Sequence, residues 1–250
     1  NLLNGTNLPS GTVKDAAVSP GGDRVLIAAD AGGDFLWEWN APGQPSLQAL
    51  RTPKGRPQLA AFSPGGKWLA LASDTNQNRL FFGANNYQIQ IWAGDGSNPR
   101  HLEGHSGDAS SLRFSPDDRF IAAVGREGVV RLWESASGRL LAFSTNLTPD
   151  RIGKLTFHGS RVLAWGQTMV QLFDTAGIES ANRARELRPM RELIYPQGIR
   201  MAAMSPDGMT ILTAGMDSKA RLNLSSGELS GELIGHTSQI NAIDSSPDGR

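Results

Sequence analysis

Short runs of alternating apolar and polar residues, each closed by a turn, recur along the chain. In the clearest set, Leu112 and Phe114 alternate with polar positions, an apolar run follows at 120–124, and a third run at 129–133 ends at a tryptophan. A Ser-Pro-Asp-Asp turn separates the first two runs, and a charged turn with a glycine separates the last two. Short alternating runs between turns of this kind are typical of antiparallel β-strands. The pattern predicts a small antiparallel sheet between residues 101 and 138.

The same order of runs and turns is repeated before and after this segment. Ser-Pro turns at 19–22, 63–66 and 205–208 hold the place of the Ser-Pro-Asp-Asp turn, while His158 and Gly159 hold it in a more divergent copy. One copy is too small to bury a core alone, so we expect the copies to be stabilised by their neighbours. The sequence predicts five complete repeats and the start of a sixth, at residues 12–43, 44–96, 97–138, 139–177, 178–227 and 228–250.

The third strand of each copy ends at a characteristic position. Trp92, Trp133 and Phe173 stand there, Trp39 is aligned with them in the first copy, and Asn223 occupies the place in the fifth. These positions recur roughly every 40–45 residues, with inserts that lengthen some of the intervals. The period indicates a repeat architecture rather than a set of unrelated hairpins.

A Gly-His pair at the start of the clearest copy and a Trp-Glu pair at its end resemble the WD40 repeat. These pairs are Gly104-His105 and Trp133-Glu134. The resemblance implies an all-β fold, a β-propeller of the WD40 type with one four-stranded blade per repeat. It also implies five full blades and the opening of a sixth in this chain, and seven blades in the complete propeller. Because the sequence stops at Arg250 within a predicted turn, we expect it to be part of a larger protein.

The resemblance further implies structural roles for residues that would otherwise suggest chemistry. In WD40 repeats a histidine, a hydroxyl residue, an acidic turn residue and the tryptophan form a chain of hydrogen bonds. His105, Glu127 and Trp133 occupy three of these places, and the hydroxyl is missing because its position falls near Ala123 or Gly125. The residues predicted to be structural are His105, Glu127, Trp133, His236, Trp39, Trp92 and Asp217.

The composition narrows the range of partners. The 250 residues have a formal net charge of zero and no cysteine, so a disulfide framework and cysteine-based metal sites are excluded. Neutral charge gives no general attraction to nucleic acid or to acidic membranes. No apolar run approaches the roughly 18 residues that a membrane helix requires. We expect a cytoplasmic protein without a membrane segment.

No motif in the sequence predicts catalysis, a cofactor or a metal site. His101, Glu103 and His105 form H-x-E-x-H, but the zinc-peptidase motif is H-E-x-x-H on a helix. Here Gly104 interrupts the pattern and strands follow it. His158 is interpreted as a turn residue, because no nucleophile motif such as G-x-S-x-G accompanies it. We therefore expect no enzymatic activity, no cofactor, no bound metal and no small-molecule substrate.

The resemblance implies a rigid platform for protein or peptide partners. We expect a non-catalytic protein–protein interaction scaffold or sensor within a multidomain or multisubunit assembly, as in bacterial proteins where WD40 arrays accompany signalling domains. One alternative is a peptidase-type or TolB-like propeller with an enzymatic or carbohydrate-binding role. Another is nucleic-acid binding through an arginine-rich top face. The Gly-His and Trp-Glu pairs favour WD40 over the first alternative, and the neutral charge disfavours the second.

An insert in the second repeat marks the expected partner-binding face. It spans residues 74–87, where the clearest copy has only a short turn, and it contains an arginine and two phenylalanines. In WD40 propellers, the loops before the first strand and after the second strand share the top face. Arginine and aromatic residues are enriched at interface hot spots. A structural alternative is that Phe81 and Phe82 only cover the edge of their own blade. The residues predicted to bind a partner are Arg51, Arg56, Arg79, Phe81, Phe82 and Arg126.

Overall fold

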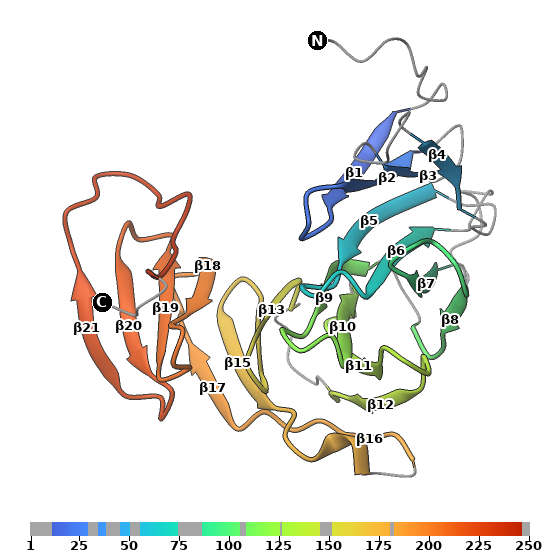
Figure 1. Ribbon diagram of the computed structural model, residues 1–250. Helices are drawn as coiled ribbons and strands as arrows, with labels where there is room; N and C mark the ends of the chain where they lie inside the picture. Colours follow the sequence, from blue (N-terminus) through green and yellow to red (C-terminus); the bar gives the residue numbers. More distant parts are fainter. Residues whose placement is uncertain are drawn as a thin grey trace, which may run out of the picture. The chain divides into compact units, whose positions relative to one another are not determined.

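The alternating runs form β-strands throughout the part of the chain that the structure describes. Within that part, every regular element is a strand except one 3₁₀ turn, Ile178–Ser180 (Figure 1). The predicted all-β class is confirmed. The chain forms two compact units, Asn1–Ser106 and Gly107–Arg250, which we describe separately. The computed structural model describes residues 12–29, 35–38, 46–50, 56–74, 87–105, 109–125, 127–145, 152–180 and 183–246.

The first unit contains two antiparallel sheets of four strands, and in both sheets the spatial order of the strands follows the sequence. The first sheet consists of β1 (Val13–Val18), β2 (Arg24–Ala29), β3 (Phe35–Glu38) and β4 (Ser46–Ala49). The second sheet consists of β5 (Arg56–Phe62), β6 (Trp68–Asp74), β7 (Tyr87–Ala93) and β8 (Arg100–Leu102).

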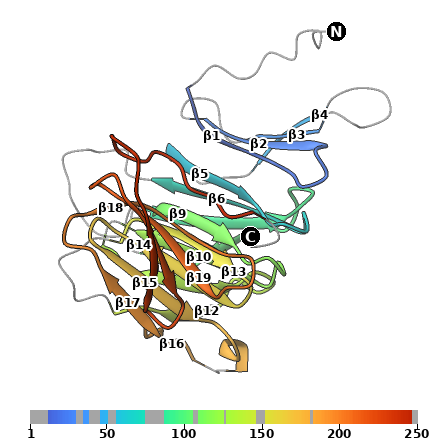
Figure 2. The same ribbon diagram turned by 90° about the vertical axis from the view of Figure 1, so that its left-hand side faces the viewer.

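The second unit contains three more sheets with the same antiparallel order. The third sheet also has a short parallel strand, β16 (Arg185–Glu186), at the outer edge of β12 (Figures 1 and 2). The third sheet consists of β9 (Ala109–Phe114), β10 (Phe120–Gly125), β11 (Val130–Glu134), β12 (Leu140–Phe143) and β16. The fourth consists of β13 (Lys154–His158), β14 (Arg161–Trp165), β15 (Met169–Asp174) and β17 (Arg191–Ile194). The fifth consists of β18 (Ile199–Met204), β19 (Thr210–Gly215), β20 (Ala220–Leu224) and β21 (Leu229–Leu233).

Each sheet takes its fourth strand from the beginning of the next repeat predicted from the sequence. For example, β8 belongs to the predicted repeat 97–138 but pairs with β7 of the second sheet. Likewise β21, predicted as the start of the sixth repeat, completes the fifth sheet by pairing with β20. Residues 234–246 form no strand. This offset means that backbone hydrogen bonds join consecutive repeats, so the boundaries of the repeats and of the sheets do not coincide.

The Ser-Pro turns between first and second strands share one hydrogen-bond pattern. The hydroxyl of Ser115 accepts a hydrogen bond from the backbone N–H of Phe120 at 2.9 Å, and it donates to the carboxylate of Asp117 at 2.6 Å. The side chain therefore satisfies a backbone group of the turn, which is the reason Ser and Asp favour such positions. Ser19, Ser63 and Ser205 accept the corresponding hydrogen bond from the backbone five residues later.

Apolar residues of facing sheets form the cores inside each unit. In the first unit, Leu26 and Leu36 of the first sheet share a buried cluster with Trp92 of the second sheet. In the second unit, Leu132 of the third sheet shares one with Phe173 of the fourth. These clusters fit the expectation that a sheet with an apolar face is stable only when another sheet covers that face.

Strand pairing corrects the alignment of the third-strand ends in the first sheet. Trp133 pairs with Ile121, the sixth residue after the turn serine Ser115. By the same count from Ser19, the equivalent residue in the first sheet is Trp37, which pairs with Val25. The alignment with Trp39 was therefore two residues too late, and Trp39 itself lies outside the described residues. The equivalent positions are Trp37, Trp92, Trp133, Phe173 and Asn223.

A candidate binding pocket

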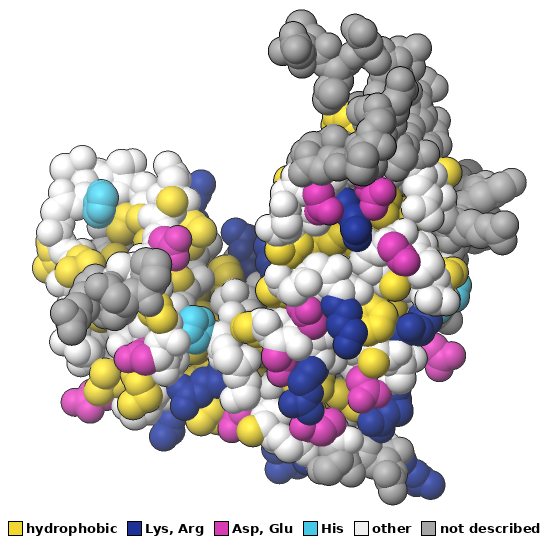
Figure 3. All heavy atoms as spheres, viewed as in Figure 1, with side chains coloured by type: hydrophobic (Ala, Val, Ile, Leu, Met, Phe, Trp, Pro, Cys, Tyr) yellow, Lys and Arg dark blue, Asp and Glu magenta, His cyan; other side chains and the backbone are white. Residues whose placement is uncertain are grey.

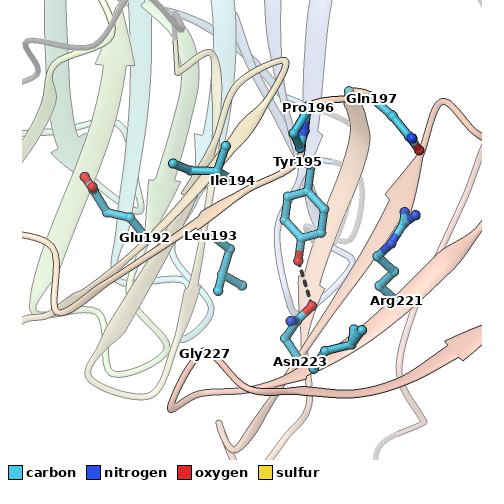
Figure 4. A pocket seen from close by; sticks show the side chains of 11 residues that line it. Glu192, Leu193, Ile194, Tyr195, Pro196, Gln197, Arg221, Asn223 and Gly227 are labelled. Atoms are coloured by element: carbon cyan, nitrogen blue, oxygen red, sulfur yellow. Dashed lines mark hydrogen bonds between the residues drawn. The ribbon is translucent and has the colours of Figure 1, made fainter.

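A pocket opens between the fourth and fifth sheets of the second unit, where the outer strand β17 faces β20 and β21 (Figure 4). Its volume of about 480 Å³ is within the range of roughly 300–1,000 Å³ that is usual for ligand sites in proteins. Tyr195 and Asn223 reach toward one another in it, and Arg221 extends from the same strand as Asn223 (Figure 4). Leu193 and Leu229 also line the pocket.

Asn223, which lines the pocket, stands where the other described sheets have a large aromatic residue. Trp92 and Phe173, at the equivalent positions of the second and fourth sheets, are each at most 1% exposed and belong to the core between two sheets. Asn223 is also buried, but its short amide side chain fills much less volume than an indole or a phenyl ring. Removing ring volume from a packed interface leaves space unless neighbours collapse into it.

Tyr195 provides the hydrogen-bond partner of Asn223. It follows β17 directly, and its hydroxyl donates to Oδ1 of Asn223 at 2.7 Å. The next residue, Pro196, restricts Tyr195 to an extended backbone and begins a tight turn that Gly198 closes with an N–H bond to the Tyr195 carbonyl. Gly198 has φ of +90°, and a Cβ there would lie 3.0 Å from the sulfur of Met216, so the turn needs glycine. Burial raises the pKa of the Tyr195 phenol above its ordinary value of 10.0.

Arg221 is held in a fixed orientation on the pocket wall. Its guanidinium bonds both carboxylate oxygens of Asp217 and, through Nε at 2.9 Å, the carboxylate of Glu232. The hydrogen bond from Arg221 holds the pKa of Asp217 below its ordinary value, and the bond to Asp217 raises the pKa of Arg221. Glu127 and Arg131 form the same pair, four residues apart, in the third sheet. The acidic turn residues predicted to be structural are thus each paired with an arginine of the following strand.

The rim of the pocket is apolar and exposed. Leu229 is 52% exposed and Ile194 is 68% exposed, whereas Leu193, which also lines the pocket, is buried. Hydrophobic side chains also reach the surface over β20 and β21 in the left part of Figure 3. Exposed apolar side chains beside a pocket that contains a few polar groups mark a candidate surface for binding another molecule.

The residues predicted to be structural are placed as follows. His105 is buried, at 8% exposure, and Trp92 and Trp133 are fully buried. The predicted hydrogen bond of His105 with Glu127 or Trp133 stays a prediction. His236 is exposed and lies in the part of residues 234–246 that forms no strand.

Most of the residues predicted to bind a partner lie outside the described part of the chain. Only Arg56 is described, as the exposed first residue of β5. The hypothesis of a partner site on that face stays a prediction, as does its structural alternative. The pocket was not predicted, although the sequence contains its signal: Asn223 occupies a position that is aromatic in the other repeats. Arg51, Arg79, Phe81, Phe82 and Arg126 are the residues outside the description.

The histidines that resemble catalytic or metal-binding groups have structural partners. His101 accepts a hydrogen bond from the amide of Gln90, its cross-strand neighbour, at 3.2 Å. His158 donates from Nε2 to the carbonyl oxygen of Pro206 at 2.6 Å, which ties the end of β13 to the turn of the fifth sheet. Within the described residues, no three His, Cys, Asp or Glu side chains are grouped closely enough to hold a metal ion. The same residues include no helix long and apolar enough to cross a membrane.

Comparison with known proteins agrees with the repeat and the sheet topology. The family model "WD domain, G-beta repeat" matches residues 96–134 and 227–250. Together with the five repeated sheets, this match shows that the chain contains WD40 repeats, as the sequence predicted, and the fold is of the WD40 β-propeller type. The predicted number of blades stays a prediction.

Several curated relatives are similar over part of the chain. Autophagy-related protein 16 of Arabidopsis thaliana is 22% identical over 184 residues, which cover 70% of this chain and 33% of that protein. Small ribosomal subunit protein RACK1z of Oryza sativa subsp. japonica is 28% identical over 134 residues, covering 51% of this chain and 38% of that protein. Cross-pathway control WD-repeat protein 2 of Flammulina velutipes is 28% identical over 125 residues, covering 48% and 38%. The chain thus spans less than half the length of these relatives.

Proposed function

We propose that the chain is a non-catalytic protein-interaction scaffold that binds a segment of a partner protein in the pocket between the fourth and fifth sheets. The single observation that carries the proposal is this pocket, with a hydrogen-bonding floor at Asn223 and an exposed apolar rim at Ile194 and Leu229. A few side chains in well-packed pockets, most often Trp, Tyr or Arg, dominate the affinity of many protein interfaces.

The family supports a binding role over a catalytic one. WD40-repeat proteins generally act as platforms for other proteins, and the names of the relatives, which include a small ribosomal subunit protein, agree with a part in a larger assembly. The matches do not favour a peptidase-type, TolB-like or nucleic-acid-binding role. We also propose that the protein is cytoplasmic.

Site-specific photo-crosslinking in the native cell tests this function. A photoreactive phenylalanine analogue placed at Ile194, on the pocket rim, is compared with the same analogue at Met209. Met209 is a matched control because it is also an exposed apolar residue of the second unit, at 56%, but does not line the pocket. We expect the analogue at position 194, but not at position 209, to crosslink to a defined protein. We expect that protein, once purified, to bind the native chain at least tenfold more tightly than the Leu229→Glu variant. Equal crosslinking from both positions, or equal binding to the variant, contradicts the proposal.

A further inference from the structure

We infer that the pocket accepts an aromatic side chain of the partner, with tryptophan preferred over phenylalanine. This inference rests on the proposed function and specifies the chemistry that the same site recognises. It follows from three observations: the equivalent residues of the other sheets, the hydrogen-bonding groups on the pocket floor, and the orientation of Arg221.

The first observation is that equivalent interfaces between sheets of one unit are completed by a ring. Trp92 completes the core between the first and second sheets, and Phe173 completes the core between the third and fourth. Between the fourth and fifth sheets the same kind of apolar wall is present, since Leu172 and Leu193 face Ile211 in one buried cluster. On the fifth sheet the position equivalent to Trp92 and Phe173 carries no ring, because the residue is Asn223. A ring supplied by a partner has apolar walls to pack against.

The second observation concerns the groups at the bottom of the pocket. The hydroxyl of Tyr195 uses its proton in the bond to Asn223, and a phenol oxygen can also accept a hydrogen bond. An indole N–H is a donor without acceptor capacity, and a phenyl ring has no donor. A buried donor that finds an acceptor avoids the free-energy cost of an unsatisfied polar group. Tryptophan is therefore the ring best matched to this floor.

The third observation is the restraint on Arg221. Its contacts with Asp217 and Glu232 fix the guanidinium plane on the wall before any ligand binds. A guanidinium held near an aromatic ring attracts the face of that ring, and the entropy of ordering the side chain has already been lost in the free protein. Exposed Ile194 and Leu229 then contact the residues next to the inserted ring.

A binding experiment with small probes tests the inference directly. N-acetyl-L-tryptophanamide, N-acetyl-L-phenylalaninamide and N-acetyl-L-leucinamide are titrated into protein with labelled leucine and isoleucine methyl groups, and nuclear magnetic resonance shifts are recorded. We expect saturable shifts of Leu193, Ile194 and Leu229 with the tryptophan amide, at an affinity on the order of 1 mM, as befits a single side chain. The phenylalanine amide is expected to bind several-fold more weakly, and the leucine amide to cause no saturable shift.

The Asn223→Trp variant provides the decisive control, because it supplies from the chain the ring that the equivalent positions contain. It is expected to remain folded and to bind the tryptophan amide at least tenfold more weakly. If that variant does not fold, Leu229→Glu and Tyr195→Phe replace it, the first removing the apolar rim and the second the hydroxyl acceptor. Binding of the leucine amide as tight as that of the tryptophan amide, or full binding to the folded variants, overturns the inference.

The two proposals fail in different ways. If the crosslinked partner binds the folded Asn223→Trp variant as tightly as the native chain, the pocket does not take an aromatic ring, while the interaction function stands. If the tryptophan amide binds but no partner crosslinks at Ile194, the pocket has the inferred chemistry and the proposed function is wrong. If the partner binds Asn223→Trp more weakly than the native chain but binds the exposed control Met209→Ala normally, both the inferred ring chemistry and the proposed function are supported.

Discussion

The hydroxyl of Tyr195 donates a hydrogen bond of 2.7 Å to Oδ1 of Asn223, which joins the residue after β17 to the third strand of the fifth sheet. At the equivalent place Trp92 and Phe173 belong to the buried apolar clusters described above, which they share with the facing sheet. One polar pair thus replaces the packing of a ring. The replacement keeps the two sheets linked while leaving a pocket of about 480 Å³ beside them.

Truncating the two equivalent residues should have different costs. Phe173→Ala removes a fully buried ring from the core between the third and fourth sheets, and it should lower the free energy of unfolding by about 3–5 kcal/mol. Asn223→Ala removes one hydrogen bond beside an existing pocket, at a cost of about 1 kcal/mol. Urea denaturation followed by circular dichroism measures both, with Met209→Ala as an exposed control. Equal losses for the two variants would show that Asn223 is packed as tightly as Phe173.

The raised pKa of Tyr195 makes a prediction at alkaline pH. Burial disfavours the phenolate, so Tyr195 should ionise above its ordinary value of 10.0 in the folded protein. The stability contributed by the buried neutral phenol is fully present below the ordinary pKa of 10.0 and is lost as the pH rises through the raised pKa. Ultraviolet absorbance should show a tyrosine ionising above pH 10.0, and Tyr195→Phe should remove this step. A step that persists in the variant would belong to another group.

The pair between Asp217 and Arg221 makes the opposite prediction at acid pH. Because the hydrogen bond from Arg221 lowers the pKa of Asp217, the carboxylate contributes stability that is present above its ordinary value of 3.8 and is lost as the pH falls through the folded pKa. Asp217→Asn should therefore be less stable than the native chain at neutral pH. Thermal melting temperatures of the two proteins should converge as the pH drops well below 3.8. A difference that is independent of pH would mean that the carboxylate charge is irrelevant.

Removing the serine hydroxyl from the Ser-Pro turn of the third sheet should destabilise the protein. Ser115→Ala leaves the buried N–H of Phe120 without its side-chain acceptor, which should lower the free energy of unfolding by about 1–3 kcal/mol. Ser137→Ala is a suitable comparison, because Ser137 is an exposed turn residue whose hydroxyl bonds Glu134 and the backbone N–H of Arg139. That variant should change the free energy by less than about 0.5 kcal/mol. Denaturant titrations in which both serines behave alike would contradict the structural role of the turn.

The sequence by itself determined the strands, the turns and the repeat. Alternation with a period of two marks each strand, and Ser-Pro turns such as that at Ser115 supply local hydrogen bonds that do not depend on distant residues. These signals are local, so they predicted the all-β class and the family. They did not fix the alignment of the first copy. Trp37 and Trp39 are two residues apart and thus share one face, so alternation suits both, and only the pairing of Trp37 with Val25 decides between them.

Only the tertiary structure decided which repeat completes which sheet and where the pocket lies. The fourth strand of each sheet pairs across a repeat boundary, which no alternating pattern specifies. The sequence showed that Asn223 replaces a ring, but not that the hydroxyl of Tyr195, directly after a strand of another sheet, would lie 2.7 Å from Oδ1 of Asn223. That contact depends on the Pro196 turn, on the pairing of β17 with β15 and on the packing of two sheets. Such packing is a sum over many distant contacts, and a local pattern of residues does not contain it.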